Sequence, residues 1–388
     1  MQSINVPSSL KFIGDSAFMY CKGLERLTFS ECLESIGELA FAYCFNLKEA
    51  ILPDSLMEMG DGVFYYDFSL CKATLPKVIE KIPLGTFYCC LSLENIVIPE
   101  TVTTIGEGAY GCCNIKNLTI PDSVTNIAER AFIGCSIESV ELPKKINEIP
   151  HEMFLQCDGL KKIIIPNNIS SIGSCAFADN RDLNTVIIPD SVTKIGENAF
   201  SSCPSLSLIS IEAEKINFDT VNESGETISD DYDIIDNENV TFLAKKNTET
   251  YDSLVKRDYN VIPYSFTVNK DDKDKPMLAL DGKVVLTEDM WSCICRLVKD
   301  TDVQYIYFKE FDFGDMMPEY VIVDYDKDEF KYKDLVLSII KDGDTIRLGM
   351  VDEKKSFFEL VEALVEQFIF TVENIIRAAW RYIFKHWK

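Results

Sequence analysis

Residues 183–203 read LNTVIIPDSVTKIGENAFSSC, and this pattern returns throughout the first half of the chain. A proline marks each return at an interval of 22 or 23 residues, and Ser30 fills the one slot that lacks it. The prolines are Pro7, Pro53, Pro76, Pro99, Pro121, Pro143, Pro166 and Pro189. An aromatic column follows eleven places behind: Phe18, Phe41, Phe64, Phe87, Tyr110, Phe132, Phe154, Phe177 and Phe200. Two locked periodicities indicate a repeat array, which is normally a binding surface.

Each unit is expected to contribute one half-buried strand, because apolar and other residues alternate at its end, as in Leu206, Ile209 and Ile211. The site six places past the proline is also apolar: Ile13, Ile36, Met59, Ile82, Ile105, Ile127, Ile149, Ile172 and Ile195. A unit of 23 residues is too short to bury these side chains alone. Stacked units would share one core and align their strands as a parallel sheet.

Two features of the repeat concern its turns. Glycine follows the central apolar residue in most units, but Pro83 and Pro150 replace it in two, so this position does not demand a positive φ. Two units lose one residue before their strand, between Cys113 and Ile115 and between Cys135 and Ile137, which predicts tighter turns there.

These residues resemble the leucine-rich repeats of the BspA-like (Treponema-type) class. The shared pattern is nearly complete in Leu183–Cys203, and the resemblance covers about residues 4–211. It implies a curved α/β solenoid with a parallel sheet on one face. It also implies protein binding or adhesion, and occurrence in surface proteins of host-associated bacteria and protists.

Half of the 14 cysteines form one column, fourteen places past the proline. They are Cys21, Cys44, Cys90, Cys113, Cys135, Cys157 and Cys203, and Asp67 and Asn180 fill the two remaining slots. Because Asp and Asn cannot form disulfides but bond turns well, we interpret the column as structural. So many unpaired thiols favour a reducing compartment or a buried, reduced column.

The sequence predicts no catalytic, cofactor-binding or metal site. Cys293 and Cys295 have no second pair at zinc spacing, and the chain has only two histidines. His151 with a cysteine would be a conceivable catalytic pair. However, its column otherwise holds acidic residues such as Glu129 and Glu197, which favours a solvated position.

Residues between the buried strand positions point to the other side of the predicted sheet. The candidate protein-binding residues on this face are Arg26, Thr28, Glu49, Lys72, Asn95, Asn117, Ser139, Glu141, Lys162 and Thr185. The alternative interpretation is that these are only sheet-forming surface residues.

Charge limits the partners. A formal charge of −25 disfavours nucleic acid and anionic membrane surfaces, and favours either a partner with a basic surface or simple solubility.

The first ten residues do not resemble a signal peptide, and no transmembrane segment is evident. The chain as it stands would be cytoplasmic, whereas the resemblance implies the cell surface or secretion.

Three regions are expected: the solenoid over 1–211, an acidic segment with a closing strand–helix–strand over 212–268, and a small α+β module over 269–388. The closing helix should begin at a Thr248 cap. In the module we expect a hairpin around Asp281–Gly282, a helix from Thr287, and strands over Gln304–Phe308, Tyr320–Tyr325 and Thr345–Met350.

An amphipathic helix is predicted over about Lys355–Lys385. It would dock on its own module, pair with a second copy, or lie on a membrane surface, and the sequence leaves these three alternatives open. For the whole chain we therefore expect a non-enzymatic protein-binding scaffold. The alternative is an enzyme or ligand-sensing unit within residues 270–388.

Overall fold

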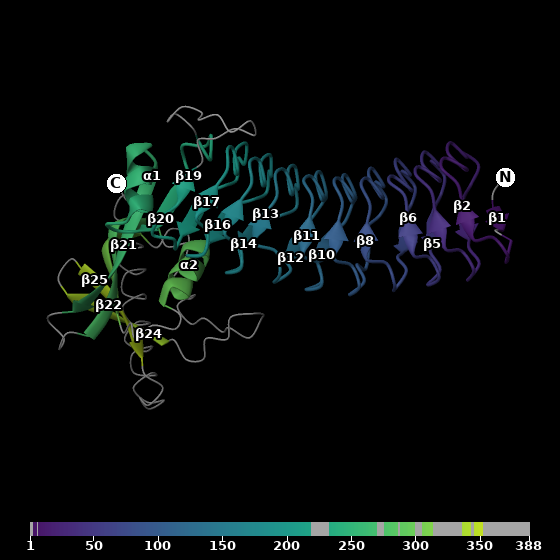
Figure 1. Cartoon of the computed structure of the whole chain (residues 1–388). Helices are drawn as coiled ribbons and strands as arrows, with labels where there is room; N and C mark the ends of the chain where they lie inside the picture. Colours follow the sequence, from purple (N-terminus) through teal and green to yellow (C-terminus); the bar gives the residue numbers. More distant parts are fainter. Residues whose placement is uncertain are drawn as a thin grey trace, which may run out of the picture. The chain divides into compact units, whose positions relative to one another are not determined.

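The computed structural model describes residues 3–5, 7–218, 233–269, 275–285, 288–298, 305–312, 336–342 and 345–351. The chain divides into two compact units, Met1–Val261 and Ile262–Lys388. The first unit is a stack of similar turns that begins at β1 and ends beyond β19 (Figure 1).

The strand predicted in each repeat forms one wall of this solenoid. Its members are β1 (Ser3–Asn5), β3 (Arg26–Thr28), β5 (Glu49–Ile51), β7 (Lys72–Thr74), β10 (Asn117–Thr119), β12 (Ser139–Glu141), β14 (Lys162–Ile164), β16 (Thr185–Ile188), β18 (Leu208–Ile211) and β20 (Thr241–Lys245). Neighbours pair in parallel with the register that the repeat period requires, as in Arg26 with Glu49 and Glu49 with Lys72. The predicted parallel sheet and its columns are confirmed.

A second wall was not predicted. Short strands run at the position six past the proline: β2 (Phe12–Ile13), β4 (Ser35–Ile36), β6 (Glu58–Met59), β8 (Lys81–Ile82), β9 (Thr104–Ile105), β11 (Asn126–Ile127), β13 (Glu148–Ile149), β15 (Ser171–Ile172), β17 (Lys194–Ile195) and β19 (Asn217–Phe218). Residues 7–218 contain strands and turns and no helix. The repeats therefore build a β-solenoid, and the expectation of an α/β solenoid was wrong. Strands of two residues were too short for a sequence pattern to reveal.

Two prolines interrupt the second wall. In the other repeats the residue after the central Ile donates its N–H to the preceding turn, as Gly60 N does to Ile36 O at 2.8 Å. Pro83 and Pro150 have no N–H to donate. The wall accordingly separates into β2-β4-β6, β8-β9-β11 and β13-β15-β17-β19. Pro83 directly follows β8 and Pro150 directly follows β13, and these are the first strands after the two breaks.

The first wall is interrupted where the repeat length changes. β10 and β12 are the two strands that follow the shortened turns, and they pair only with each other within this wall. Residues 95–98, which precede them by one repeat, form no strand. When a turn loses one residue, the strand that follows it is displaced relative to a neighbouring strand that follows a full-length turn, and the pairing of the two strands changes.

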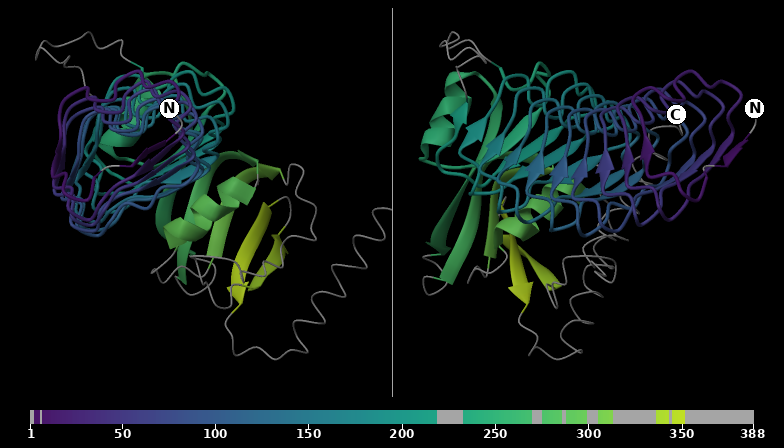
Figure 2. Two further views of the ribbon diagram at one scale, coloured as in Figure 1. Left: turned by 90° about the vertical axis from the view of Figure 1, so that its right-hand side faces the viewer. Right: turned by 45° about the vertical axis from the view of Figure 1, so that its right-hand side comes forward.

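The predicted aromatic column is a continuous stack inside the solenoid. From Phe18 to Phe200, consecutive rings lie 5.2–5.9 Å apart between centroids, with interplanar angles of 1–18°. All rings after Phe18 are fully buried. Viewed along the stack, the backbones of the turns superpose (Figure 2).

Two further columns adopt a left-handed backbone. The first is Ser16, Leu39, Gly62, Gly85, Gly108, Arg130, Glu152, Cys175 and Asn198, and the second is Tyr20, Tyr43, Tyr66, Cys89, Cys112, Gly134, Gln156, Asp179 and Ser202. Their non-glycine members have φ between 51° and 62°. The glycine column that follows the central Ile has no positive φ, as expected. At Gly106 the absence of a side chain provides space instead, because a Cβ there would lie 2.6 Å from Leu84 N.

The closing strand and helix are confirmed. β20 continues the first wall, with Leu208 opposite Thr241, and Phe242 stacks on Tyr259 at 4.9 Å between centroids. Helix α1 (Glu249–Lys256) begins at Thr248, whose hydroxyl accepts a hydrogen bond from Tyr251 N at 3.2 Å.

The second unit contains β21 (Asn260–Asn269, which starts just before it), β22 (Lys275–Val285), α2 (Glu288–Val298), β23 (Tyr305–Asp312), β24 (Val336–Asp342) and β25 (Thr345–Val351). β22 pairs with β21 antiparallel and with β23 in parallel, and β25 lies antiparallel between β23 and β24.

The hairpin expected around Asp281–Gly282 was wrong. β22 passes through these residues as one strand, and a register irregularity between Leu280 and Lys283 absorbs the Asp-Gly pair. The expected helix is α2, and the strands expected at Gln304–Phe308 and Thr345–Met350 correspond to β23 and β25. The expected strand at Tyr320–Tyr325 and the amphipathic helix at 355–385 lie outside the described residues.

Replacing Phe132 by Ala should lower the free energy of unfolding by about 3–5 kcal/mol, because it opens a cavity between two rings of the stack. The same substitution at Phe12, which is 62% exposed, should have little effect. Chemical denaturation of both variants checks this. Equal losses at the two positions would contradict the central role of the stack.

Candidate functional site

The candidate binding surface is the outward side of the first strand wall, which we call the sheet face. It comprises the predicted residues Arg26, Thr28, Glu49, Lys72, Asn95, Asn117, Ser139, Glu141 and Lys162. Strand register aligns its charged members in rows across neighbouring repeats, so that Arg26, Glu49 and Lys72 are consecutive. All nine side chains are exposed or partly exposed.

Polar contacts run along these rows. Lys72 Nζ lies 2.6 Å from Glu49 Oε1, and Ser139 Oγ lies 2.8 Å from Asn117 Oδ1. The hydrogen bond from Lys72, together with its positive charge, lowers the pKa of Glu49. The face thus presents alternating charges that are partly matched within it and remain accessible to solvent.

Apolar side chains interleave with the polar ones. Ile51 is 46% exposed, and Val97 is 82% exposed beside Asn95. A mixture of exposed branched side chains, amides and both signs of charge is typical of a surface that makes specific polar and apolar contacts.

Thr185 does not belong to the sheet face, and its assignment was wrong. Its exposed fraction is 0%, and its neighbours Ile187, Leu208 and Ser210 in the last repeats are also buried. Two of these four residues are apolar and two are polar, so their types alone do not reveal the burial. The accessible sheet face therefore ends at Lys162.

The cysteine column is an interior hydrogen-bond ladder, which confirms its structural interpretation. Cys44, Cys90, Cys113, Cys135, Cys157 and Cys203 each donate to the carbonyl oxygen of the stacked aromatic residue one repeat earlier, at 3.0–3.3 Å. Asn180 does the same through its amide, donating to Phe154 O at 3.0 Å. Burial raises the pKa of Cys157 and Cys203 to about 12, so these thiols keep the protons they donate.

Asp67 is the exception in this ladder. Its Oδ1 accepts a hydrogen bond from Cys44 N at 2.7 Å, but its Oδ2 is buried without a partner among the described residues. A carboxylate has no proton to donate to a carbonyl, whereas a carboxylic acid does. Burial raises the pKa of Asp67 well above its ordinary value, which favours the acid form.

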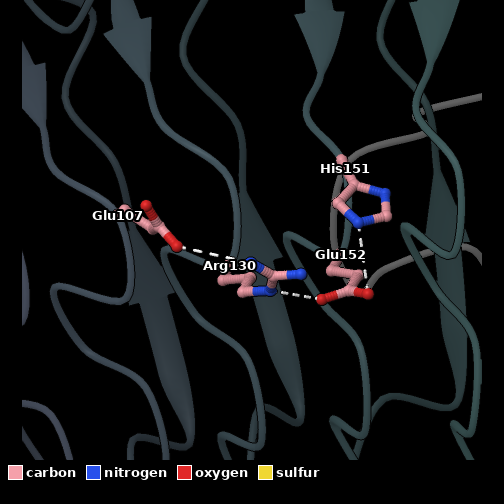
Figure 3. Close-up of polar contacts among 4 residues, drawn as sticks. All are labelled: Glu107, Arg130, His151 and Glu152. Carbon is pink, nitrogen blue, oxygen red and sulfur yellow. Dashed lines mark hydrogen bonds and ion pairs between the residues drawn. The ribbon is translucent and has the colours of Figure 1, made fainter. Parts of the chain in front are cut away.

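A second polar cluster lies at the turns that follow the second wall, and sequence reasoning did not find it. Arg130 lies between two carboxylates, with Nε 2.5 Å from Glu152 and Nη1 3.4 Å from Glu107 (Figure 3). His151 Nε2 lies 3.2 Å from Glu152, and the His151 side chain is only 20% exposed. His151 is thus a partly buried member of this network, which corrects the expectation of a solvated position. The sequence could not reveal this network, because its members lie in different repeats and contact one another only when the repeats are stacked.

An outer aromatic strip, which was not predicted, lies over the first three repeats. Tyr20, Tyr43 and Tyr66 stack at 4.6 and 5.4 Å between centroids, and Phe45 stacks on Phe68 at 5.3 Å. Only the recurrence of tyrosine every 23 residues could have revealed it. Since these rings cover one another's faces, the strip presents mainly ring edges.

The thiols near His151 do not resemble an activated nucleophile. Burial first, and then the carboxylates of Glu152 and Glu197, raise the pKa of Cys175, whereas a catalytic cysteine that acts at neutral pH needs a lowered pKa. Within the described ranges no cluster of His, Cys, Asp or Glu could hold a metal ion. No helix among them is long and apolar enough to cross a membrane.

Comparison with known proteins gives a family match. The BspA type leucine-rich repeat region matches residues 1–110 and 80–207, in six copies. No curated protein matches the sequence.

Several solved structures are similar. A leucine-rich repeat protein from Bacteroides ovatus is 26% identical over 67% of this chain and 76% of its own, with a TM-score of 0.45. A leucine-rich cell surface protein from Faecalibacterium prausnitzii is 28% identical over 54% of this chain and 72% of its own, with a TM-score of 0.34. A leucine-rich repeat protein from T. pallidum is 23% identical over 47% and 77%, with a TM-score of 0.34.

Asp67→Asn should stabilise the protein at neutral pH by about 1–3 kcal/mol, because an amide can donate where the carboxylate cannot. The folded-state pKa of Asp67 is raised, so the contribution of Asp67 to wild-type stability is greatest below the unfolded pKa of about 4 and falls as pH rises toward the folded pKa. The advantage of the variant should therefore shrink as pH falls to about 4. Urea denaturation across this range measures it.

Asp54→Asn is the matched control. Asp54 is exposed, and hydrogen bonds from Lys77 lower its pKa. This variant should show no stabilisation at neutral pH. A gain at Asp54 equal to that at Asp67, or a gain at Asp67 that does not change with pH, would contradict the prediction.

Proposed function

Because the chain belongs to the BspA-type leucine-rich repeat family, we propose that it is a non-enzymatic protein-binding scaffold that docks its partner on the sheet face. This surface combines regular spacing with varied chemistry. Leucine-rich and other solenoid repeats commonly use such extended surfaces for binding.

The observation that carries the proposal is the contrast between the inside and outside of the same strands. The middle residue of each strand is buried or partly buried and apolar, as in Leu27, Ala50 and Ala73. The residues beside it on the outer side, such as Arg26, Glu49 and Lys72, differ in charge from repeat to repeat. Stacking fixes the backbone of the inner and the outer residues of each strand, so the outer side chains can vary without disturbing the core.

The charges indicate what kind of partner fits. The whole chain carries −25, which would accelerate association with a partner of net positive charge. Locally, the basic side chains of Arg26, Lys72 and Lys162 alternate with Glu49 and Glu141, so the docking patch itself would need acidic groups at defined positions. Adhesion at the cell surface is the finer form of this proposal, and it rests on the family resemblance.

The test begins with a partner. The full chain, carrying a photo-crosslinker at Val97 in the centre of the sheet face, would be used to capture and identify bound proteins. The affinity of a captured protein for the uncrosslinked chain would then be measured by calorimetry.

Reversing Arg26, Lys72 and Lys162 together to Glu should weaken that affinity by about tenfold or more, because like charges would face the partner's acidic groups. The matched control reverses Lys11, Lys77 and Lys144, which are exposed and ion-paired to a neighbouring repeat as Lys72 is. Both triple variants change the net charge equally, so the control reports long-range charge effects. Equal affinities of the two variants would overturn the proposal.

A further inference from the structure

Two neighbouring repeats place a cysteine at the same partly exposed turn position. Cys89 and Cys112 both lie in the second left-handed column, with φ of 60° and 58°. Tyr66 precedes them in this column and Gly134 follows, so they form a single isolated pair. Both thiols are free in the structure.

The backbone holds the two positions in register. Cys89 N donates to Gly111 O at 2.7 Å, and Cys112 N makes the equivalent bond to Ile133 O at 2.6 Å. Turns stacked in this way repeat about every 4.8 Å. A disulfide requires Cα atoms about 4.4–6.8 Å apart, so the repeat spacing falls within its range. The Cys112 thiol is also close enough to Cys89 to contribute to its raised pKa.

The other cysteines of the solenoid are arranged differently. Those of the interior ladder also stack, but Cys90 and Cys113 are buried and donate to carbonyl oxygens, so an oxidant cannot reach them. Cys32 and Cys71 are exposed, yet the equivalent positions of neighbouring repeats hold no cysteine. Cys21 is partly exposed, but its neighbour in the next repeat, Cys44, is buried, whereas Cys89 and Cys112 are both partly exposed.

We propose that Cys89 and Cys112 form a reversible disulfide between the fourth and fifth repeats, by exchange with a small-molecule disulfide. One thiolate attacks a sulfur of the small disulfide, which forms a mixed disulfide and releases one small thiolate. The second cysteine thiolate then displaces the second small thiolate. Two protein thiols are oxidised, one small disulfide is reduced to two thiols, and these take up the two protons.

The geometry favours a bond that reduces easily. Cβ atoms held in register stand about one repeat spacing apart, slightly more than the roughly 3.5–4.5 Å of a relaxed disulfide. Closing that gap strains the bond, and strained, exposed disulfides are the labile ones. Burial, followed by the neighbouring Cys112, raises the pKa of Cys89 to about 11, so exchange should accelerate in alkaline solution.

The test treats the full chain with oxidised glutathione at mildly alkaline pH, and then alkylates the remaining thiols. Trypsin leaves residues 82–116 as one fragment, and cleavage after Glu94, Glu100 and Glu107 separates its two cysteine pairs. Mass spectrometry should then find the two pieces bridged, with two hydrogens lost. Before reduction, Cys32 and Cys71 should carry glutathione adducts. Dithiothreitol should then release the two bridged pieces from each other.

Cys89→Ser and Cys112→Ser should each abolish the bridged fragment completely, and Cys71→Ser, the matched control, should leave its yield unchanged. Serine is close in size to cysteine, and circular dichroism verifies that each variant is folded. Stable glutathione adducts at both Cys89 and Cys112 without a bridge would overturn the proposal. So would a bridge that persists in Cys89→Ser, because it would have to use Cys90.

Discussion

Each turn of the solenoid directs many of its backbone N–H and C=O groups along the stack, where groups of the neighbouring turns satisfy them. This constraint fixes the repeat spacing at every level. Leu39 N reaches Asp61 O and Tyr43 N reaches Tyr65 O, both at 2.8 Å, in the turns that follow the second wall. Because a buried backbone group without a partner is costly, neighbouring turns must keep a common register. The stacked rings and aligned strands follow from that register.

The interior shows how polar groups are accommodated under this constraint. A turn beside the aromatic stack leaves a carbonyl oxygen inside, and a thiol one repeat later donates to it, as Cys113 does to Phe87. A thiol suits the position because it is small, weakly polar and protonated. Asn180 supplies the same bond with an amide. Asp67 could supply it only as an acid, because a carboxylate has no proton to donate, and burial raises its pKa.

The same constraint leaves the outer side chains free to vary. Along the sheet face, charge changes from repeat to repeat over strands of constant geometry. At the turns, adjacent repeats bring together residues far apart in sequence, such as Arg130 with Glu107 and Glu152. Cys89 and Cys112 meet for the same reason. Function in this scaffold therefore depends on which side chains neighbouring repeats place at equivalent positions.

The sequence by itself determined the period, the aromatic stack, the interior thiol column and the strand register, because each is a local pattern repeated at a constant interval. It also placed nine of the ten candidate face residues at accessible positions. The second strand wall, the left-handed turns at residues such as Leu39 and Arg130, and the burial of Thr185 were decided only by the tertiary structure. No local propensity favours a left-handed leucine or a two-residue strand. Hydrogen bonds to the neighbouring turn impose both, and they exist only once the turns are stacked.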